Sequence, residues 1–568
     1  MKYQQLAELY EKVSSTTKRL EKTEILANFL KKVSETNKDI MYLLVGDIYP
    51  EYDERKIGIS NQIAIQAISK STGNSKENIV KEWKKIGDLG KVAEKLSKEK
   101  KQSTLLSAGQ LTIKKVLENL RKLPELEGKG TINKKLSLIT ELLTNANFIE
   151  SKYLIRTLIG DLRIGIQEST IREALAKAFF KKEDSEKIQR AIDKTNDLAV
   201  VFEICKKGKL LGLEKLNLEV GKPIKAMLAQ KVKTIKEGFK TLGTPCAIEY
   251  KYDGFRLIIH KQGNEVKLFT RSLENVTKQF PEVVDYILKY VKGNSFILDS
   301  EAVGYNKKTK KYTDFQAISQ RIRRKYHIEK LQKELPVEVN VFDILYYNGK
   351  SQLDVEFEKR AKLVRKIITN HVFKIISSKM IITSDEKRAK EFYKKALRDN
   401  QEGVMMKNLK SPYKPGRRVG NMLKIKPEER DLDLVITGAE YGAGKRSGWL
   451  SSFILSCKGK KTEYLEIGKV GTGIKEKAES GGVSFQQLTD LIKPLIIKEK
   501  GKRVEIKPKI IVAVTYQEIQ KSPNYNSGWA LRFPRITALR EDKPLSEIAD
   551  LKEVEKDFLN QKRNWRYG

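Results

Sequence analysis

The sequence predicts a multidomain α+β protein with an all-helical domain, a mixed α/β domain and a small β-barrel. The first observation is length, because 568 residues exceed one hydrophobic core and about three or four domains are expected. The second is a change from helical to strand-like patterning at Gly221-Lys222-Pro223. The third is a further change near residue 429, where strands alternate with glycine-rich turns. We expect domains at 1–215, 216–428 and 429–568.

The charge of the chain indicates what kind of partner it binds. There are 112 Lys and Arg against 73 Asp and Glu, so the formal net charge is +39. A surplus of this size favours a polyanion, because phosphates neutralised by Lys and Arg release counterions. A thermophile surface is also highly charged, but it explains the charge content and not its sign. The composition therefore predicts a nucleic acid partner.

The cysteines and histidines argue against two kinds of site. Cys205, Cys246 and Cys457 lie far apart, and the three histidines are equally scattered, which supports neither a disulfide framework nor a zinc site. Any metal would have to be held by carboxylates. The residues after Met1 lack the apolar segment of a secretion signal, and no apolar run approaches membrane-spanning length. We expect a cytoplasmic protein.

Helical periodicity extends from the start to about residue 215. Apolar residues recur at helical spacing between charged ones at Leu6, Tyr10, Val13, Ile25, Leu26, Phe29, Leu30 and Val33. Further on, the stretch Leu162-Arg163-Ile164-Gly165 places Arg163 and Gly165 at an expected helix end. Backbone amides and basic side chains at such an end suit phosphates without reading base sequence. Ordinary helix ends also carry glycine, so the pattern is weak by itself.

The stretch from Ala247 to Arg256 predicts a strand, a turn and a second strand, with Lys251 entering the turn. A neutral lysine amine is a nucleophile, and burial, neighbouring cations or a metal lower its ordinary pKa of about 10.4. Asp253-Gly254 provides the turn, and the Arg256 guanidinium suits a phosphate or a ribose oxygen. With 112 Lys and Arg in the chain, an ordinary surface lysine stays an alternative at this point.

Later strands carry two acids and an aromatic residue. Phe296 to Val303 is a buried run that contains Glu301, and a buried acid is costly unless it is paired or holds a metal. Phe342 lies in the next strand, and Glu402 begins another. Phe342 could stack on a base, although a lone phenylalanine in a strand is more often part of a core.

Two lysines complete the inventory of the middle region. Lys424 and Lys426 stand two apart in a strand, so both side chains lie on one face. Alternatively, Lys424 and Lys426 lie on a solvent-exposed sheet edge and have no role in a site. Together with Lys251 and the acids, they suit attack on a nucleotide phosphate, with carboxylates holding Mg²⁺ and cations neutralising phosphate charge.

The last part of the sequence predicts the small barrel. Asp433 to Thr437 and Lys509 to Thr515 are expected strands, with glycine-rich turns between them. Gly442-Ala443-Gly444-Lys445 is not a phosphate loop, because its spacing is wrong and Arg446 stands where Ser or Thr is needed. We expect a basic loop there. The tail carries a cluster of charged residues, Arg532, Arg540, Asp542 and Lys543.

The order of these motifs resembles that of the ATP-dependent DNA ligases, and most of all the archaeal members, relatives of the eukaryotic replicative ligases. The motifs are Lys251-Tyr252-Asp253-Gly254, Asp299-Ser300-Glu301, Phe342-Asp343, Glu402-Gly403-Val404-Met405-Met406-Lys407, Leu423-Lys424-Ile425-Lys426 and Arg532-Phe533-Pro534-Arg535. With the helical loop, the resemblance covers nearly the whole chain. Ser300 replaces a common glycine and Met406 a common valine, and neither departure removes a reacting group.

The resemblance implies a helical DNA-binding domain, an adenylation (nucleotidyltransferase) domain and an OB-fold barrel. It implies ATP-dependent sealing of nicks in double-stranded DNA, in DNA replication, repair and recombination. Lys251 would attack the α-phosphate of ATP and release pyrophosphate. The AMP would then pass to the 5′-phosphate at a nick, and the 3′-hydroxyl would displace it. ATP and Mg²⁺ are the expected co-substrate and metal, with Mn²⁺ as an alternative metal.

Site residues follow from their places in the motifs. The ATP-binding residues would be Glu249, Arg256, Arg271, Glu301, Phe342, Arg418, Lys424 and Lys426. The metal would be held by Glu301 and Glu402. The residues that orient pyrophosphate would be Arg532, Arg540, Asp542 and Lys543. The DNA contacts would include Arg163 and Gly165. Arg417 and Arg418 are adjacent and could exchange roles.

Two alternatives and several details stay open on the sequence alone. An RNA ligase or capping-type nucleotidyltransferase shares the lysine chemistry, but the large helical domain argues against it. A non-catalytic nucleic-acid-binding relative would lack the lysine or the acids, and none is missing. ADP, GTP or NAD⁺ could replace ATP as the donor. We expect a monomer, with a sliding clamp as a candidate protein partner.

Overall fold

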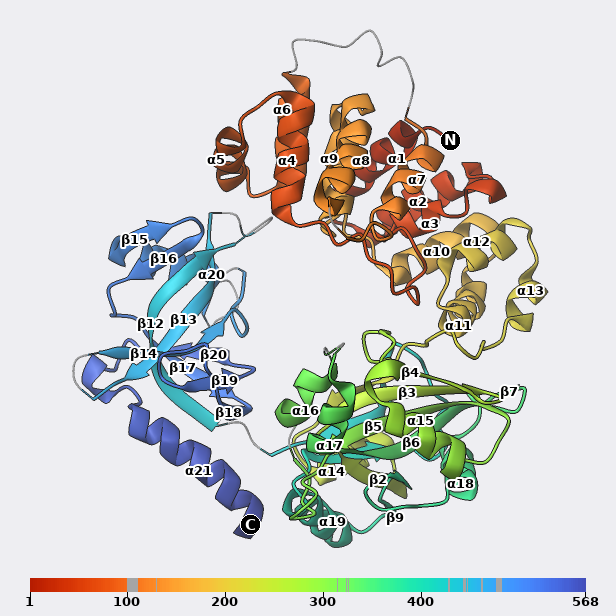
Figure 1. Cartoon of the computed structure of the whole chain (residues 1–568), viewed down its shortest axis with the longest axis vertical. Helices are drawn as coiled ribbons and strands as arrows, with labels where there is room; N and C mark the ends of the chain where they lie inside the picture. Colours follow the sequence, from red (N-terminus) through yellow and green to blue (C-terminus); the bar gives the residue numbers. More distant parts are fainter. Residues whose placement is uncertain are drawn as a thin grey trace. The chain divides into compact units, whose positions relative to one another are not determined.

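The computed structural model describes all of the chain except residues 100–110, 129, 314, 323, 325, 428–429, 443–445, 447, 461–462, 477–482 and 568. The side chains of residues 316, 418, 419, 430 and 561–567 also lie outside the description. The chain divides into two compact units. The first comprises Met1–Asn74 and Ala93–Lys426, and the second comprises Ser75–Val92 and Pro427–Gly568. Each unit is described separately (Figure 1).

The described residues up to 215 are organised as helices, as the periodicity predicts. The helices are α1 (Tyr3–Ser14), α2 (Arg19–Lys32), α3 (Ile40–Leu43), α4 (Asn61–Thr72), α5 (Lys76–Ile86), α6 (Leu89–Lys98), α7 (Ile113–Lys122), α8 (Thr131–Asn145), α9 (Phe148–Leu158), α10 (Glu168–Phe179), α11 (Ser185–Thr195), α12 (Leu198–Lys206) and α13 (Leu210–Lys215). Helix α5 belongs to the second unit. Helix α9 begins with a capping box, in which Asn147 and Glu150 each bond the other's backbone, and its residues from Glu150 to Leu158 are buried.

The rest of the first unit contains a five-stranded and a six-stranded sheet. The order of the five-stranded sheet is β1 (Leu228–Lys231), β11 (Arg418–Ile425), β10 (Gly403–Lys407), β2 (Cys246–Lys251) and β9 (Met380–Thr383). The six-stranded sheet runs β4 (Glu265–Thr270), β3 (Phe255–Gln262), β5 (Ser295–Gly304), β6 (Val337–Tyr347) and β7 (Lys350–Ser351), with β8 (Ile375–Ser377) also paired to β6. Strands β3 and β4 pair antiparallel and form a hairpin with Gly263 in its turn.

Helices cover both sheets, and a shared hydrophobic layer joins them. The helices are α14 (Ile235–Leu242), α15 (Pro281–Tyr290), α16 (Phe315–Ile322), α17 (Ile328–Glu334), α18 (Phe357–Ile367) and α19 (Glu386–Arg398). Side chains of α14 and α19 are buried against the five-stranded sheet, and those of α15 and α18 against the six-stranded sheet. Between the sheets, Ile258 and Ile297 of one pack in the same cluster as Met422 of the other. The edges of the two sheets are therefore held close enough to share polar groups.

The second unit is built on a seven-stranded antiparallel sheet. Its strands are β12 (Arg430–Tyr441), β13 (Leu450–Lys458), β14 (Tyr464–Val470), β15 (Ile496–Lys500), β16 (Arg503–Ile506), β17 (Ile511–Tyr516) and β20 (Arg535–Leu539). The other elements are the pair β18 (Glu518–Lys521) and β19 (Trp529–Arg532), and helices α20 (Phe485–Ile492) and α21 (Leu551–Tyr567). The first half of β12 pairs with β17 and the second half with β16. The register to β13 shifts at Gly438, which allows this long strand to bend between its partners.

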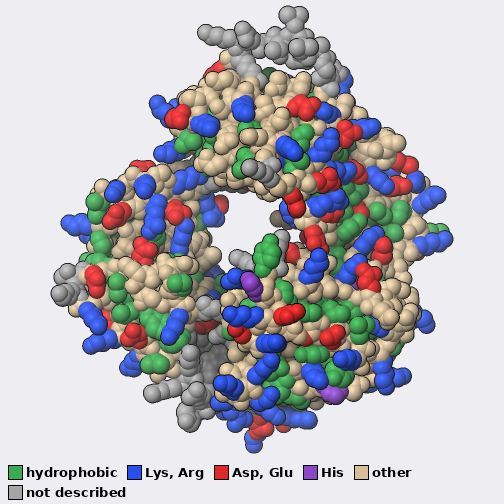
Figure 2. All heavy atoms as spheres, in the orientation of Figure 1, with side chains coloured by type: hydrophobic (Ala, Val, Ile, Leu, Met, Phe, Trp, Pro, Cys, Tyr) green, Lys and Arg blue, Asp and Glu red, His purple; other side chains and the backbone are tan. Residues whose placement is uncertain are grey.

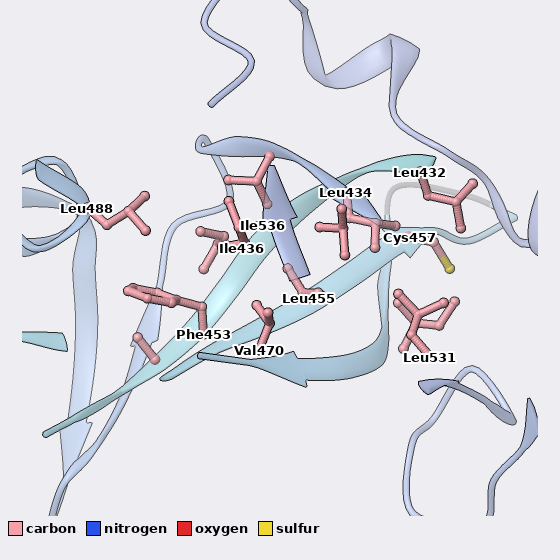
Figure 3. Close-up of a cluster of buried hydrophobic side chains, with 14 of the residues drawn as sticks. Leu432, Leu434, Ile436, Phe453, Leu455, Cys457, Val470, Leu488, Leu531 and Ile536 are labelled. Atoms are coloured by element: carbon pink, nitrogen blue, oxygen red, sulfur yellow. The ribbon is translucent and has the colours of Figure 1, made fainter. Parts of the chain in front are cut away.

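Apolar side chains of these strands form one buried cluster, as in Figure 3. Leu434, Ile436, Phe453 and Leu455 are fully buried there, and Leu488 of α20 joins them. The bent sheet with one apolar interior is the OB-fold-like barrel that the sequence predicts. The predicted basic loop at residues 443–445 lies outside the described residues.

Lys and Arg side chains are spread over the visible face of each part and are interspersed with acids (Figure 2). The described residues contain no helix that is both long enough and apolar enough to cross a membrane.

Candidate active site

Lys251 is the last residue of β2, and an acid lies directly beside it. The β2–β10 register pairs Lys251 with Gly403, and the backbone N–H of Glu402 donates to the Lys251 carbonyl at 2.9 Å. The Lys251 Nζ lies 2.5 Å from Glu402 Oε2, and the Lys426 Nζ lies 2.7 Å from the same oxygen. Burial disfavours the Glu402 charge, but the two lysines outweigh burial and lower the carboxyl pKa to about 2. Glu402 is therefore ionised at neutral pH.

Two glycines allow the strands to come this close. A Cβ on Gly254 would lie 2.3 Å from the Ala302 carbonyl oxygen of β5. Gly403 has φ of +144°, and a Cβ there would lie 2.1 Å from the Ile425 carbonyl oxygen. Neither space admits a side chain, so glycine at these positions is required by the close approach of the backbone.

Glu301 lies on β5 opposite Arg256, in the electrostatic field of the same cluster. Burial raises its pKa to about 7, and the nearby Lys251 and Arg256 counter this only in part. A carboxyl whose charge is incompletely compensated suits a cation. The described residues contain no cluster of three or more His, Cys, Asp and Glu arranged to hold a metal.

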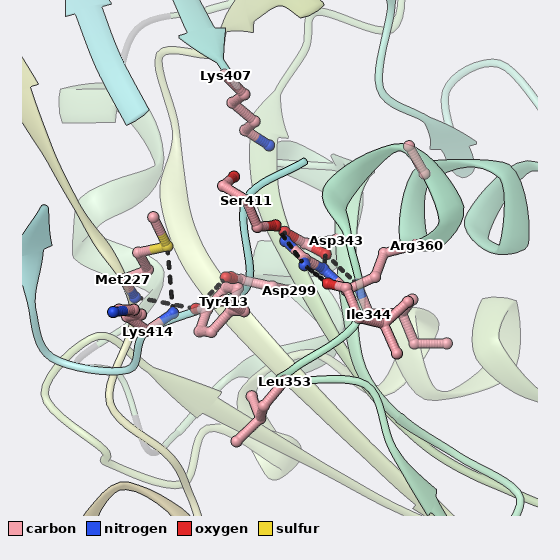
Figure 4. Close-up of polar contacts among 12 residues, drawn as sticks. Met227, Asp299, Asp343, Ile344, Leu353, Arg360, Lys407, Ser411, Tyr413 and Lys414 are labelled. Carbon is pink, nitrogen blue, oxygen red and sulfur yellow. Dashed lines mark hydrogen bonds and ion pairs between the residues drawn. The ribbon is translucent and has the colours of Figure 1, made fainter. Parts of the chain in front are cut away.

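Arg256 is held by the buried Asp299 carboxylate and the buried Tyr413 phenol. Figure 4 shows Asp299 and Tyr413. Its Nε donates to Asp299 Oδ1 at 2.6 Å, and its Nη2 donates to Asp299 Oδ2. The Tyr413 hydroxyl donates to Asp299 Oδ2 at 2.6 Å and accepts from the Met227 N–H at 2.9 Å. Asp299 is fully buried. The guanidinium is thereby fixed at one edge of the cluster.

The Phe342 ring is half-buried between two cations. The Arg256 Cζ lies 5.0 Å from the ring centroid, and the Lys407 Nζ lies 4.9 Å from it. The Lys407 Nζ is also 2.6 Å from Glu249 Oε2, and both side chains are almost fully buried. Burial raises the Glu249 pKa even though Lys407 opposes the shift. Glu249, Phe342 and Lys407 thus form one contiguous group.

A second buried arginine supports the strand that carries Phe342. Arg360 Nε donates to Asp343 Oδ1 at 2.7 Å, and Nη2 donates to Oδ2 at 3.0 Å. Arg360 Nη1 also donates to the Ser411 carbonyl at 3.1 Å (Figure 4). This fork ties β6 to α18 and to the loop before β11, because the residues come from all three elements.

The structure brings together some of the predicted nucleotide-site residues and leaves others apart. Lys251, Glu301, Glu402 and Lys426 share one cluster, and Arg256 joins it to the Phe342 group, as shown above. Arg271 follows β4 and its side chain is exposed. Lys424 lies on β11 opposite Met405 and is half-buried.

The structure describes the side chain of Arg417 but not that of the adjacent Arg418. Arg417 Nη1 lies 3.3 Å from Glu186 Oε1, and Arg417 Nη2 lies 3.3 Å from Asp193 Oδ2. Arg417 therefore connects the loop before β11 to helix α11.

In the second unit, Asp433 forms ion pairs with two of the predicted basic tail residues. Arg540 Nη1 lies 2.8 Å and Lys543 Nζ 2.6 Å from Asp433 Oδ2, and Arg540 also pairs with Asp542 at 2.9 Å. Arg532 is separate from them and pairs with Glu518 at 2.7 Å.

The helical loop has a strained backbone and a lysine bound beneath it. Arg163 has φ of 56° and Gly165 has φ of 64°. The Lys22 Nζ donates to the Ile164 carbonyl at 2.6 Å and to the Gly165 carbonyl at 3.2 Å. Arg163 Nε donates to Asp161 Oδ2 at 2.6 Å. These bonds fix the shape of the loop.

Sequence reasoning missed several residues that hold the site. Tyr413, Arg360 and Asp433 have no local pattern that marks them, because their partners lie far away in the chain. Lys407 ends the apolar strand β10 and its side chain pairs with Glu249, and an ionisable residue that ends such a strand is the one available signal.

Three family models match successive parts of the chain. A family model described as "ATP dependent DNA ligase domain" matches residues 226–426. A model described as "DNA ligase N terminus" matches residues 2–176, and one described as "ATP dependent DNA ligase C terminal region" matches residues 446–543.

Relatives match over nearly their whole length. A DNA ligase of Nanoarchaeum equitans is 44% identical over 564 residues, and the alignment covers 99% of each chain. A DNA ligase of Thermococcus onnurineus is 40% identical over 568 residues, again with 99% of each chain covered. The solved structure titled "Pmar-Lig_PreS3" is 18% identical, covers 94% of this chain and 99% of its own, and has a TM-score of 0.57, so it shares the fold.

The fold and the three matched domains are those of a ligase. The chain belongs to the ATP-dependent DNA ligase family.

Proposed function

We propose that this protein seals nicks in double-stranded DNA through an AMP group carried on Lys251. The observation that carries the proposal is the position of Lys251, whose amine lies at the end of β2 with Glu402 and Lys426 beside it. A DNA ligase of this family must bring a nucleophile, cations and acids to one nucleotide phosphate, and this cluster contains all three.

Lys251 would react as a neutral amine. The amine would attack the α-phosphate of ATP, so that a P–N bond forms, the bond to pyrophosphate breaks and the proton that the amine loses passes to water. Lys426 and Lys424 would neutralise charge on the phosphate oxygens. Glu402 is a weak proton acceptor because its pKa is about 2. Its role is therefore to hold charge and position.

The remaining nucleotide contacts are proposed for residues of the motifs. Phe342 would stack on adenine, and Glu249 beside it would bind the base. Arg256 is already fixed by Asp299 and would contact the ribose. Arg271, in the turn after β4, would contact the ribose or the phosphate next to it. Arg418 is proposed as an AMP phosphate ligand, because Arg417 is engaged by Glu186 and Asp193.

Glu301 and Glu402 would hold a divalent cation, Mg²⁺ or Mn²⁺. Mg²⁺ takes one or two carboxylates together with waters and substrate phosphates, which fits this pair of acids. The bound cation would neutralise phosphate charge. The raised pKa of Glu301 fits this role, because a nearby cation favours the ionised carboxylate.

The other parts would act on pyrophosphate and DNA. Arg532 and the group of Arg540, Asp542 and Lys543 would orient the leaving pyrophosphate. The helical domain, proposed for residues 1–215, would grip the DNA backbone, with Arg163 and Gly165 in its loop. We propose residues 216–428 as the adenylation domain and 429–568 as the OB-fold domain.

The experiment uses the purified protein with ATP labelled at the α-phosphate, Mg²⁺ and nicked DNA. We expect label to stay on the denatured wild-type chain, to be absent from Lys251→Ala, and to be chased off by nicked DNA. Lys251→Ala should still bind DNA, because it removes one charge from a chain of +39. Wild-type sealing by Lys251→Ala would overturn the mechanism. ADP, GTP and NAD⁺ in parallel define the donor.

A further inference from the structure

Gln401 is a fully buried amide between the end of α19 and the acid Glu402. The nucleotide chemistry proposed above does not use it. A neutral polar group is seldom buried completely unless both its donor and its acceptor find partners. One of its partners lies on the segment that follows Lys251, and the other lies at the end of α19.

The end of α19 directs the Gln401 side chain inward. Asn400 adopts the left-handed conformation with φ of 56°, and the Gln401 N–H donates to the Ala396 carbonyl at 3.0 Å. A bond of this span, closed by a left-handed residue, is a Schellman-type helix end. It turns the chain abruptly from the helix into β10, with Gln401 on the buried side.

The Gln401 amide bridges two backbone groups of opposite kind. Its Oε1 accepts from the Asp253 N–H at 3.0 Å, and its Nε2 donates to the Asp399 carbonyl at 3.1 Å. Only a group that accepts on one side and donates on the other satisfies both. A carboxylate would place an oxygen against the Asp399 carbonyl, and an apolar side chain would satisfy neither group.

Asp253 belongs to the turn directly after Lys251. One end of that turn is tied to the next segment by the Glu402 N–H, which donates to the Lys251 carbonyl at 2.9 Å. The other end is tied by Gln401 through Asp253. The Asp399 carboxylate also accepts from the Tyr250 hydroxyl at 2.9 Å, so the same segment holds the residue before Lys251.

We propose that Gln401 is a positioning residue that sets the Lys251 turn against Glu402 for transfer of AMP to the lysine. This inference rests on the proposed function. Gln401 does not itself touch the reacting atoms. Through Asp253 it fixes the turn that follows Lys251, and the pairing of Lys251 with Gly403 fixes the strand end that precedes the turn.

The test compares Gln401→Met with the wild-type protein in two reactions. In single-turnover transfer from labelled ATP to the protein, we expect the rate to fall about 10- to 100-fold, the size of effect that a small misplacement of a reacting group produces. The KM for ATP should stay within about twofold, because Gln401 makes no substrate contact. Sealing of a nick that already carries AMP needs no attack by Lys251, and we expect it to fall less than about threefold.

Gln401→Glu is a second variant that keeps the length of the side chain. Its ionised carboxylate can accept from the Asp253 N–H but cannot donate to the Asp399 carbonyl. We expect slower labelling and near wild-type sealing of an adenylated nick, as for Gln401→Met. This variant also serves if Gln401→Met does not fold.

Gln189→Met is the matched control, since Gln189 is a buried, hydrogen-bonded glutamine in the helical region. It should adenylate at the wild-type rate. If the wild-type protein is labelled, an equal labelling rate in Gln401→Met or equal losses in both reactions would overturn the positioning role alone. A wild-type protein that takes no label from ATP, ADP, GTP or NAD⁺ would overturn the proposed function, and the positioning role would fall with it.

Discussion

Removing one hydroxyl, with Tyr413→Phe, tests whether the buried carboxylate that holds Arg256 needs its third donor. The hydroxyl donates to Asp299 at 2.6 Å and accepts from the Met227 N–H at 2.9 Å. In the variant, Asp299 keeps its two bonds to Arg256 but loses the phenol, and the Met227 N–H stays buried without its acceptor.

The magnitude follows mainly from these two losses, because the third contact, from Arg256 Nη2 to the Tyr413 hydroxyl, is long at 3.3 Å and Arg256 keeps its bonds to Asp299. A hydrogen bond to a charged group contributes about 1.5–3 kcal/mol, and an unsatisfied buried N–H costs about 1–3 kcal/mol. The variant no longer has to bury a hydroxyl, which offsets part of the sum. We expect the unfolding free energy around β5 to fall by about 2–4 kcal/mol, or at least about 25-fold in the opening equilibrium.

Hydrogen exchange measured by mass spectrometry is the suitable assay. All four tryptophans, Trp83, Trp449, Trp529 and Trp565, lie outside residues 216–428, so tryptophan fluorescence does not report on these sheets. Peptides from β5 and β6 do. The control is Tyr346→Phe, which removes a hydroxyl from a half-buried tyrosine of the same sheet. A difference below about 0.5 kcal/mol between Tyr413→Phe and wild type would refute the reasoning, because a surface substitution has that size.

Three further changes have expected outcomes. Gly254→Ala should destabilise the sheets by about 1–3 kcal/mol or more in denaturant unfolding, because its Cβ would lie 2.3 Å from the Ala302 oxygen. Gly420→Ala is the control and should not destabilise them, because no atom lies within 4 Å of the added Cβ. Burial raises the pKa of Glu301 to about 7, so the folded protein keeps a proton that the unfolded chain releases near pH 4.5. Stability should therefore fall as pH rises from about 5 to 7, and Glu301→Gln should flatten this slope of the denaturant midpoint. Asp433→Asn weakens the ion pairs to the basic tail residues and should slow transfer of AMP from ATP by about threefold to tenfold, while sealing of an adenylated nick stays unchanged. Equal effects on both reactions would contradict the assignment to pyrophosphate.

Local patterns in the sequence predict the parts of the site that local rules control. Phe296 to Val303 is expected as a buried strand because it is a largely apolar run, and β5 confirms it. Lys251 is expected at the end of a strand and is the last residue of β2. The pattern of strand, Gly and strand is enough to place a lysine, but it does not say what the lysine touches.

Long-range partners account for what the sequence does not predict. Gln401 meets Asp253 across 148 residues, and Arg256 meets Tyr413 across 157 residues. No periodicity connects positions so far apart, because their contact depends on how two sheets stack. The same is true of Arg360, which looks like any surface arginine of a helix and is almost fully buried against Asp343.

In the substrate-free protein, acids hold the cations of the site together. The Lys251 and Lys426 amines both lie within 2.7 Å of one Glu402 oxygen, so they are at most about 5 Å apart. At an effective dielectric constant of about 20, their mutual repulsion is about 3 kcal/mol, and the Glu402 charge compensates it. Nucleotide phosphates would carry the same negative charge to the same lysines. In the proposed function, binding of ATP therefore releases Glu402 from its two ammonium partners, and only then is its carboxylate free to share a divalent cation with Glu301.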